Sequence, residues 1–293
     1  SEARVDLNPH QVEAALFAFK SPLSKGAILA DEVGLGKTIE AGIILSEMWA
    51  ENKRNILIVV PASLRNQWNI ELMEKFYLPS FILDSESFEE GQSQISKGEK
   101  SIYICSYNFA VTNAEYFKNI DWDLIVLDEA HKLRNVYKKS NVMANALRAA
   151  FRNYKKVLLT ATPLQNNLKE LYGLISIIDP EFFSSLDTFA DQYNAVSTRD
   201  KAKYGELKGR IAHIIHRTLR NQVEEYVNFT KRTAFVQEYY PSTAEINLYN
   251  QVSDYLMREG TYGVPERQRP LLSLLVRKIM SSSAYALGYT LER

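Results

Sequence analysis

The nine residues ADEVGLGKT, at positions 30–38, combine the residue types that hold a phosphate group. A general phosphate-binding loop has glycine, four free positions and then Gly-Lys-Ser/Thr, where backbone N–H groups and a helix dipole favour an anion. In this pattern Lys37 can reach the β- and γ-phosphates of a nucleotide, and the Thr38 hydroxyl can coordinate Mg²⁺. Asp31 stands where the pattern has its first glycine. The alternative is a tight strand–helix turn that carries Lys-Thr by chance.

A second chemical pair ends the apolar stretch LIVLDEAH, at positions 124–131. Open parallel sheets place ligands at the carboxyl ends of their strands, and two adjacent acids there are costly unless they serve a metal ion or a reaction. We therefore expect Asp128 to hold Mg²⁺, directly or through water, and Glu129 to orient and deprotonate an attacking water. Alone, the same letters also fit a helix N-terminus with favourable acidic residues.

The composition limits the classes of protein to which the chain can belong. Its 293 residues include 35 Lys and Arg against 35 Asp and Glu, so any polyanion site must be a local patch. The single cysteine, Cys105, excludes an internal disulfide framework, and we expect it to be a core residue in a reducing, cytoplasmic compartment. The apolar runs are too short to span a bilayer, and we expect neither a membrane segment nor a secretory signal.

Short apolar runs must position these motifs. They are apolar throughout and alternate with amphipathic segments, which indicates an α/β fold with a doubly wound parallel sheet. We also expect a helix that begins at Pro9 with Asn8 as its cap, and a short helix within the polar segment 88–100. The expected strands are 27–30, 55–60, 81–83, 102–105, 124–127 and 156–159, and the expected helices between them are 38–49, 64–76, 108–117 and 142–149.

Helical patterns dominate after about residue 166. They predict an α/β domain over residues 1–230 with a helical appendage at about 168–216, and a second unit over residues 231–293. In this part the expected helices are 168–178, 186–194, 201–215, 242–257 and 270–286, and a strand at 233–240 is expected to end at Pro241.

The motifs DEVGLGKT and DEAH together resemble superfamily 2 helicase-like ATPases, specifically the Snf2 family, in which an Asp-Glu pair replaces the first glycine of the generic loop. The phrases ADEVGLGKTIEAGIIL and HRTLRNQV look most like a bacterial branch that includes an RNA polymerase-associated ATPase. The resemblance implies a RecA-like lobe of the P-loop NTPase class that binds ATP with Mg²⁺. Further segments resemble family motifs in the expected order, namely LNPHQ (7–11), LIVVPASLRNQW (57–68), ICSYNF (104–109) and LLTATPLQNN (158–167).

The resemblance implies roles for individual residues. Gln11 would read adenine, the catalytic set would be Glu129, Asp128 and Lys37, and the metal ligands would be Thr38 and Asp128. Coupling between sites would run through Thr160, Ala161 and Thr162. The expected nucleotide contacts are Gln11, Asp31, Glu32, Val33, Gly34, Leu35, Gly36, Lys37 and Thr38.

The resemblance also implies a nucleic-acid partner. Ser63, Arg65, Ser106 and Tyr107 would grip the phosphates of one strand of duplex DNA. Contacts of this kind position a protein on DNA without reading its sequence. We therefore expect translocation on the duplex without strand separation.

A second RecA-like lobe of a longer chain is expected as a further partner. The family binds ATP between two lobes, and we find none of motifs IV to VI, which carry an arginine finger, in this sequence. Arg217 and Arg220 resemble a paired basic segment before the crossing between lobes, although a solvated basic helix end explains them equally well. The sequence therefore predicts the ATP-binding lobe of a DNA-dependent Snf2-type ATPase, with weak turnover by itself. Two alternatives remain, an isolated nucleotide-binding and docking module without turnover and an ATPase that assists RNA polymerase.

Overall fold

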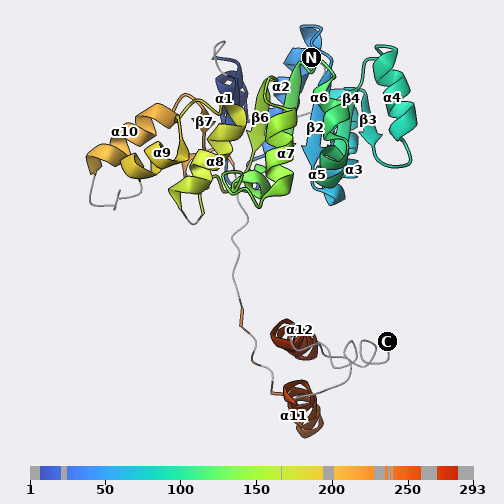
Figure 1. The fold of residues 1–293 in the computed structure, drawn as a ribbon, viewed down its shortest axis with the longest axis vertical. Coiled ribbons are helices and arrows are strands. Elements are labelled where there is room, and N and C mark those ends of the chain that lie inside the picture. The colour runs from blue at the N-terminus through green and yellow to red at the C-terminus, as the bar shows by residue number, and fades with distance from the viewer. Residues whose placement is uncertain are drawn as a thin grey trace. The chain divides into compact units, whose positions relative to one another are not determined.

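The computed structural model describes residues 7–20, 25–165, 167–193, 201–227, 235, 236, 238, 240–258 and 269–282. The chain divides into two compact units, Ser1–Phe229 and Thr230–Arg293. In the described part of the first unit, seven strands form one parallel sheet in the order β3-β4-β2-β5-β6-β1-β7 (Figure 1). The predicted α/β class and parallel sheet are therefore confirmed.

Six of the strands lie within one residue of their expected bounds at each end. Three residues or more of continuous apolar sequence were enough to locate them, and β1, β2, β5 and β6 are buried on both faces. The strands are β1 (Gly26–Leu29), β2 (Ile56–Val60), β3 (Ser80–Leu83), β4 (Ile102–Ser106), β5 (Leu124–Asp128), β6 (Lys156–Leu159) and β7 (Ile215–His216).

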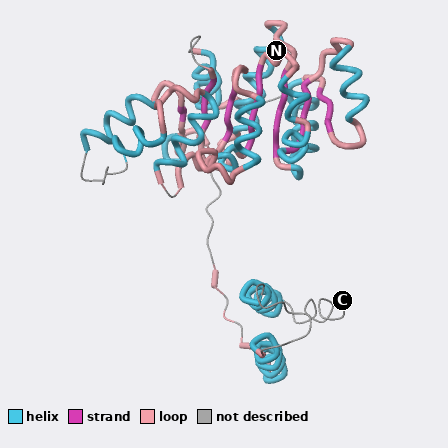
Figure 2. The backbone as a smooth tube through the Cα atoms, in the orientation of Figure 1, coloured by secondary structure: helices cyan, strands magenta, loops and turns pink. Residues whose placement is uncertain are grey.

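Helices cover both faces of this sheet, so successive strand residues enter two different cores (Figure 2). One face carries α1 (Pro9–Phe19), α2 (Lys37–Ala50) and α3 (Arg65–Phe76). The other carries α5 (Tyr107–Thr112), α6 (Ala114–Lys118), α7 (Val142–Ala150) and α8 (Leu168–Ile178), while α4 (Phe88–Ser96) follows β3. The expected start of α1 is confirmed, with Asn8 as its N-cap and Pro9 as its first residue.

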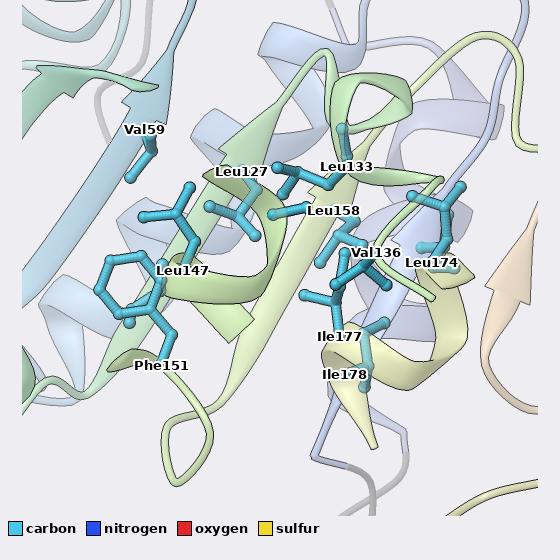
Figure 3. Packing of buried hydrophobic residues seen from close by; sticks show 14 of the residues in the cluster. Val59, Leu127, Leu133, Val136, Leu147, Phe151, Leu158, Leu174, Ile177 and Ile178 are labelled. Atoms are coloured by element: carbon cyan, nitrogen blue, oxygen red, sulfur yellow. The ribbon is translucent and has the colours of Figure 1, made fainter. Parts of the chain in front are cut away.

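The second of these cores fixes the strands that carry the chemistry. Leu127 of β5 and Leu158 of β6 pack with Leu147 of α7 and with Leu174 and Ile177 of α8 (Figure 3). Each fully buried side chain of this kind contributes about 1.5–3 kcal/mol. Cys105 is also buried here, and burial raises the pKa of its thiol, as expected of a core cysteine.

Two expected helices have different ends in the structure. The expected helix 108–117 is two helices, α5 and α6, because the backbone leaves helical geometry at Asn113, whose side chain donates to the Phe109 carbonyl at 3.0 Å. The expected helix 201–215 is α10 (Lys201–Ile211), and the chain then enters β7. Pairing with β7 gives acceptors to N–H groups of β1 that would otherwise lie unpaired in the core.

The expected appendage is continuous with the core of the first unit. Helices α9 (Leu186–Tyr193) and α10 follow α8, and Phe189, Tyr193 and Leu207 are buried in the same cluster as the strand residues. Three short 3₁₀ turns lie at η1 (Ala62–Leu64), η2 (Ala130–Leu133) and η3 (Arg220–Gln222).

The second unit contains α11 (Thr243–Met257) and α12 (Arg269–Ser282). Helix α11 begins after Ser242, whose hydroxyl accepts from the Glu245 N–H at 3.3 Å, and Leu256 packs with Val276 of α12. Part of the expected strand 233–240 lies outside the described residues, and its described residues are not in a strand. No helix in the described part of the chain is long and apolar enough to cross a membrane.

Candidate nucleotide site

Three adjacent strands bring the predicted motifs to one edge of the sheet. Leu159 of β6 is in register with Leu29 of β1 on one side and with Asp128 of β5 on the other. Since neighbouring strands lie about 4.8 Å apart, the ends of β1 and β5 are separated by about 10 Å. The loop 30–38, Thr160 and the Asp128-Glu129 pair therefore lie side by side, as a site at the carboxyl ends of parallel strands requires.

Two glycines allow the loop its tight path into α2. Gly34 and Gly36 have φ values of +89° and +93°, in the left-handed region that side chains disfavour. Gly36 is the N-cap of α2, and a Cβ atom on it would collide with Gln11 Nε2. A substitution at Gly36 would therefore disturb both the loop and helix α1.

Donors from three directions hold the carbonyl oxygens of the loop. Lys37 Nζ lies 2.8 Å from the Asp31 oxygen and 3.4 Å from the Glu32 oxygen. His10 Nε2 and Gln11 Nε2 each lie 2.9 Å from the Leu35 oxygen. These contacts turn the carbonyl oxygens toward the protein.

The N–H groups of the same loop are left to bind an anion. Among the described residues, none accepts a hydrogen bond from the N–H of Gly34, Gly36, Lys37 or Thr38. Successive free N–H groups at a helix N-terminus form a concave site for phosphate, and the helix dipole adds to the attraction.

Gln11 supports the loop in this structure. Its side chain is buried, its Oε1 accepts from the Asn8 N–H at 3.1 Å, and its Nε2 donates to the Leu35 carbonyl. Recognition of adenine by Gln11 stays a prediction.

The acidic pair in the loop has partners on a distant segment. Asp31 is fully buried, and its Oδ1 accepts from the Thr218 N–H at 2.8 Å and lies 3.4 Å from His216 Nδ1. Glu32 Oε2 accepts from the Arg220 N–H at 2.8 Å. The two carboxylates therefore satisfy N–H groups of residues 218–220, and contact of Asp31 and Glu32 with a nucleotide stays a prediction.

Asp31 also faces a buried acid on α2. Burial raises the pKa of Asp31, but hydrogen bonds from His216 and Thr218 outweigh burial and keep that pKa below its ordinary value. Burial, together with the charge of Asp31, raises the pKa of Glu40 to about 9. Glu40 therefore keeps its proton at neutral pH and can share it with the neighbouring Asp31 side chain.

A different set of donors holds Asp128. Its Oδ2 accepts from Trp68 Nε1 at 2.9 Å, its Oδ1 accepts from the Glu129 N–H at 2.8 Å, and its carbonyl accepts from the Tyr107 hydroxyl at 2.7 Å. Burial raises the pKa of Asp128, and the Trp68 bond opposes burial only in part. Sequence reasoning missed Trp68, although it ends the LIVVPASLRNQW segment and lies on the buried face of α3.

Glu129 is the more accessible member of this pair. It has φ +51° and ψ +44°, a left-handed conformation that is uncommon for a residue with a side chain and that clusters at active sites. Its Oε2 lies 3.0 Å from His131 Nδ1, and its side chain is 39% exposed. The carboxylate is thus accessible and oriented by one neighbour, as a general base requires.

Thr160, Ala161 and Thr162 follow β6 between the two pairs. The Thr160 N–H donates to the Leu29 carbonyl at 3.0 Å, and its hydroxyl accepts from the Thr162 N–H at 3.2 Å. Thr160 is fully buried, whereas Thr162 is exposed. This turn therefore connects the end of β1 to the surface beside Asp128.

The residues expected to contact nucleic acid differ in exposure. Ser63 is exposed, and Arg65 and Ser106 line a cavity of about 550 Å³, where Arg65 Nη1 lies 3.3 Å from Asp84 Oδ2. Tyr107 is buried with its hydroxyl on the Asp128 carbonyl. The side chain of Tyr107 is therefore occupied within the protein, and its contact with nucleic acid stays a prediction.

The oxygen donors at this edge fit Mg²⁺. Mg²⁺ is usually held by one or two protein groups together with substrate phosphates and water. The Thr38 hydroxyl and the Asp128 carboxylate are such groups. The described residues contain no cluster of three or more His, Cys, Asp or Glu that could hold a metal ion by itself.

Comparisons of the sequence with known proteins agree on one family. The SNF2-related domain matches residues 10–282. An uncharacterized ATP-dependent helicase, YqhH of Bacillus subtilis, is 34% identical over 84% of the chain and 42% of its own length. The RNA polymerase-associated protein RapA of Pectobacterium atrosepticum is 35% identical over 66% of the chain and 21% of its own length. The chain thus spans less than half the length of these relatives.

Solved structures show the same fold. The SWI2/SNF2 ATPase core of Sulfolobus solfataricus in complex with double-stranded DNA matches with a TM-score of 0.62 at 22% identity, over 95% of this chain and 58% of that chain. A second structure, of the Sulfolobus solfataricus SWI2/SNF2 ATPase core domain, matches with a TM-score of 0.63 at 21% identity, over 96% of this chain and 57% of that chain.

Proposed function

Because the chain belongs to the SNF2-related domain family, we propose that its first unit is the ATP-binding lobe of a DNA-dependent ATPase that translocates on duplex DNA. The observation that carries the proposal is the pairing of the anion site at residues 34–38 with Asp128 and Glu129 across a single strand. A nucleotide held by its phosphates at the loop would extend its terminal phosphate toward those acids.

Lys37 and Thr38 would hold the phosphates. The carbonyl oxygens of Asp31 and Glu32 already hold the Lys37 ammonium at the loop. A phosphate oxygen would become a further acceptor for this ammonium. Thr38 and Asp128 would hold Mg²⁺, which neutralises charge that develops on the transferred phosphoryl group. Trp68 and the Glu129 N–H fix the Asp128 carboxylate for that contact.

Glu129 would orient the attacking water and take its proton. Its side chain is accessible beside the buried Asp128, and His131 orients one of its oxygens. Thr160 and Thr162 would transmit the state of this edge to the DNA-facing surface, since their turn joins the end of β1 to solvent.

Duplex DNA is the proposed polymer. A structural neighbour with this fold was solved with double-stranded DNA, and the cavity lined by Arg65 and Ser106 presents cationic and hydroxyl groups of the kind that contact phosphates. RapA, a relative, is described as RNA polymerase-associated, so a polymerase is the second proposed partner. Loss of DNA stimulation in Arg65→Ala of a longer protein with both lobes, with Arg210→Ala as control, would support the first.

A second lobe would complete the catalytic site. Charge on the γ-phosphate in the transition state needs a cation, and an arginine finger contributes about 10³–10⁵ in rate. We propose that the 293 residues alone hydrolyse ATP slowly, with little stimulation by DNA. A phosphate-release assay that gives the same DNA-stimulated rate for this chain and for a longer protein with both lobes would contradict this part.

Nucleotide binding is the direct test of the proposed site. Lys37→Ala removes a charge-assisted contact of about 1.5–3 kcal/mol, so ATP-Mg²⁺ affinity should fall about 10–100-fold. Calorimetry of wild type and variant measures it, with Lys75→Ala on α3 as control because that lysine pairs with Glu71 on the surface. Equal affinities for wild type and Lys37→Ala would contradict the site. ATP binding without turnover in a two-lobe protein would favour the docking-module alternative.

A further inference from the structure

The hydrogen-bond ladder of the sheet continues past β1 into the phosphate loop. Residues 214–220, here called the strap, run parallel to residues 28–32 and accept from every second N–H group. The donor residues are two positions apart, as in the hydrogen-bond ladder between parallel strands. The beginning of the loop therefore continues the hydrogen bonding of the sheet. The N–H groups of Ile28, Ala30 and Glu32 donate to the carbonyls of Ile214, His216 and Thr218 at 2.8, 2.7 and 3.2 Å.

Where the loop turns away from the strap, side-chain carboxylates take the place of backbone carbonyls as hydrogen-bond acceptors. The N–H groups of Thr218 and Arg220 still need acceptors, and they find the carboxylates of Asp31 and Glu32, each at 2.8 Å. Glycine at position 31 would leave the Thr218 N–H without this acceptor. The acidic pair therefore extends the attachment of the strap by two residues.

Arg220 closes the attachment from the opposite direction. Its Nε and Nη2 both donate to the Val33 carbonyl, with Nε at 3.1 Å, and a Cβ atom on Gly34 would lie 3.3 Å from Nη2. The residue is exposed, so packing gives it little stabilisation of its own. A planar fork on one oxygen fixes direction as well as distance, which a flexible ammonium does not.

We propose that the strap is a latch that holds the phosphate loop in its anion-binding shape, with Arg220 as the positioning residue and Asp31 and Glu32 as its anchors. The proposal rests on the proposed nucleotide site and adds a residue that acts on the nucleotide only through the loop. It also explains why an acidic pair stands where a generic phosphate loop has glycine.

The latch would raise the fraction of molecules in which the loop has its anion-binding shape. If loss of Arg220 leaves the loop in its binding shape about a tenth of the time, the apparent dissociation constant rises about tenfold. The chemistry after binding would change less, because Arg220 contacts neither Asp128 nor Glu129 in the described structure.

The test measures loop order and nucleotide affinity in the same variants of the 293-residue chain. Arg220→Ala should speed amide hydrogen exchange at Glu32 and Leu35, whose N–H groups are hydrogen-bonded within the loop and to the strap, about tenfold without nucleotide, and should weaken ATP-Mg²⁺ binding about tenfold. Arg220→Lys should restore part of both effects, because an ammonium can still donate to the Val33 carbonyl. Arg210→Ala is the control, since Arg210 bonds Tyr193 and Phe182 away from the loop.

The outcomes separate the latch from the nucleotide site itself. If wild type binds ATP-Mg²⁺ and Arg220→Ala weakens binding with unchanged exchange in the free loop, then Arg220 contacts the nucleotide directly and the latch is wrong. Unchanged exchange and unchanged affinity also overturn it. If wild type does not bind nucleotide, the proposed function fails, while exchange in the free loop still reports on the latch. Thermal unfolding of each variant shows whether a change is local to the loop.

Discussion

The two Asp-Glu pairs of this molecule occupy equivalent places and have different partners. Asp128 is the last residue of the buried strand β5, Asp31 comes two residues after the buried strand β1, and the ends of both strands are in register with the same residue of β6. The aspartate is buried in each pair, and the glutamate is more exposed. Asp31 and Glu32 accept from backbone N–H groups of the strap, whereas Asp128 accepts from an indole and leaves Glu129 accessible.

The difference appears in the protonation of the two aspartates. Burial acts on both, but hydrogen bonds from His216 and Thr218 keep the pKa of Asp31 below its ordinary value, while the pKa of Asp128 is raised. The charged form of Asp31 is thus already stabilised by donors of the protein on its Oδ1. An acid that is buried and incompletely compensated is completed by a cation, so the Asp128 pair is the one suited to Mg²⁺.

The largest effect is expected from a substitution that removes catalysis by the Asp128-Glu129 pair and leaves the Asp31-Glu32 pair intact. Glu129→Gln keeps the size of the side chain and removes its basicity, so turnover in a two-lobe protein should fall about 10²–10⁴-fold while ATP still binds. Glu32→Gln should instead act mainly on KM, through the loop. Steady-state phosphate release measures both. Turnover of Glu129→Gln within a few-fold of wild type would show that Glu129 is not the base.

The next effect tests the support of Asp128. Trp68→Phe keeps an aromatic ring in the core and removes the N–H that bonds Asp128 Oδ2, so the Mg²⁺ concentration for half-maximal turnover should rise about 10-fold. Trp122→Phe is a matched control, because Trp122 is also buried and donates its indole N–H to the Phe117 carbonyl at 2.8 Å.

Titration of turnover with Mg²⁺ at saturating ATP distinguishes a positioning role from a packing role. A rise in the half-maximal Mg²⁺ concentration for Trp68→Phe alone supports positioning of Asp128. An equal loss of thermal stability in both tryptophan variants, with unchanged Mg²⁺ dependence, would mean that Trp68 acts only in the core.

The sequence predicts the fold better than the partners of individual side chains. Six strands were located because apolar runs are a local signal. Strand β7 has only two residues and is defined by its pairing with the distant β1, which no local pattern shows. The sequence did not predict that helices end near Asn113 and at Ile211. The first end coincides with a bond from the Asn113 side chain to the backbone, and the second precedes the pairing of β7 with β1.

The candidate site divides in the same way. The motif letters indicated Lys37, Thr38, Asp128 and Glu129 through local context. The partners of Asp31 lie 187 residues away along the chain, and the bond from Trp68 to Asp128 spans 60, so neither is visible in a local pattern. The family resemblance suggested that Asp31 was functional, but only the fold shows which N–H group its carboxylate serves.

The smallest expected effect concerns the charge on Asp31. Asp31→Asn keeps an oxygen for the Thr218 N–H but loses the charge, and hydrogen bonds to charged groups are stronger by about 1–2 kcal/mol. The groups that face Asp31 are Glu40 from α2 and His216 from β7, with Lys37 on its carbonyl. Since the folded pKa of Asp31 is lowered, its contribution to stability is complete above the unfolded pKa of about 3.9 and is lost as pH falls through the folded pKa.

The free-energy difference between wild type and Asp31→Asn should therefore be present above about pH 4 and shrink below it. Urea unfolding at each pH measures it. Asp179→Asn is the contrast, because Asp179 also has a lowered pKa but pairs with Lys25 at the surface, where such pairs contribute about 0–1 kcal/mol. If the Asp31→Asn difference were the same at pH 7 and pH 3.5, neutral hydrogen bonding would hold the strap, and the contrast between the two aspartates would not rest on charge.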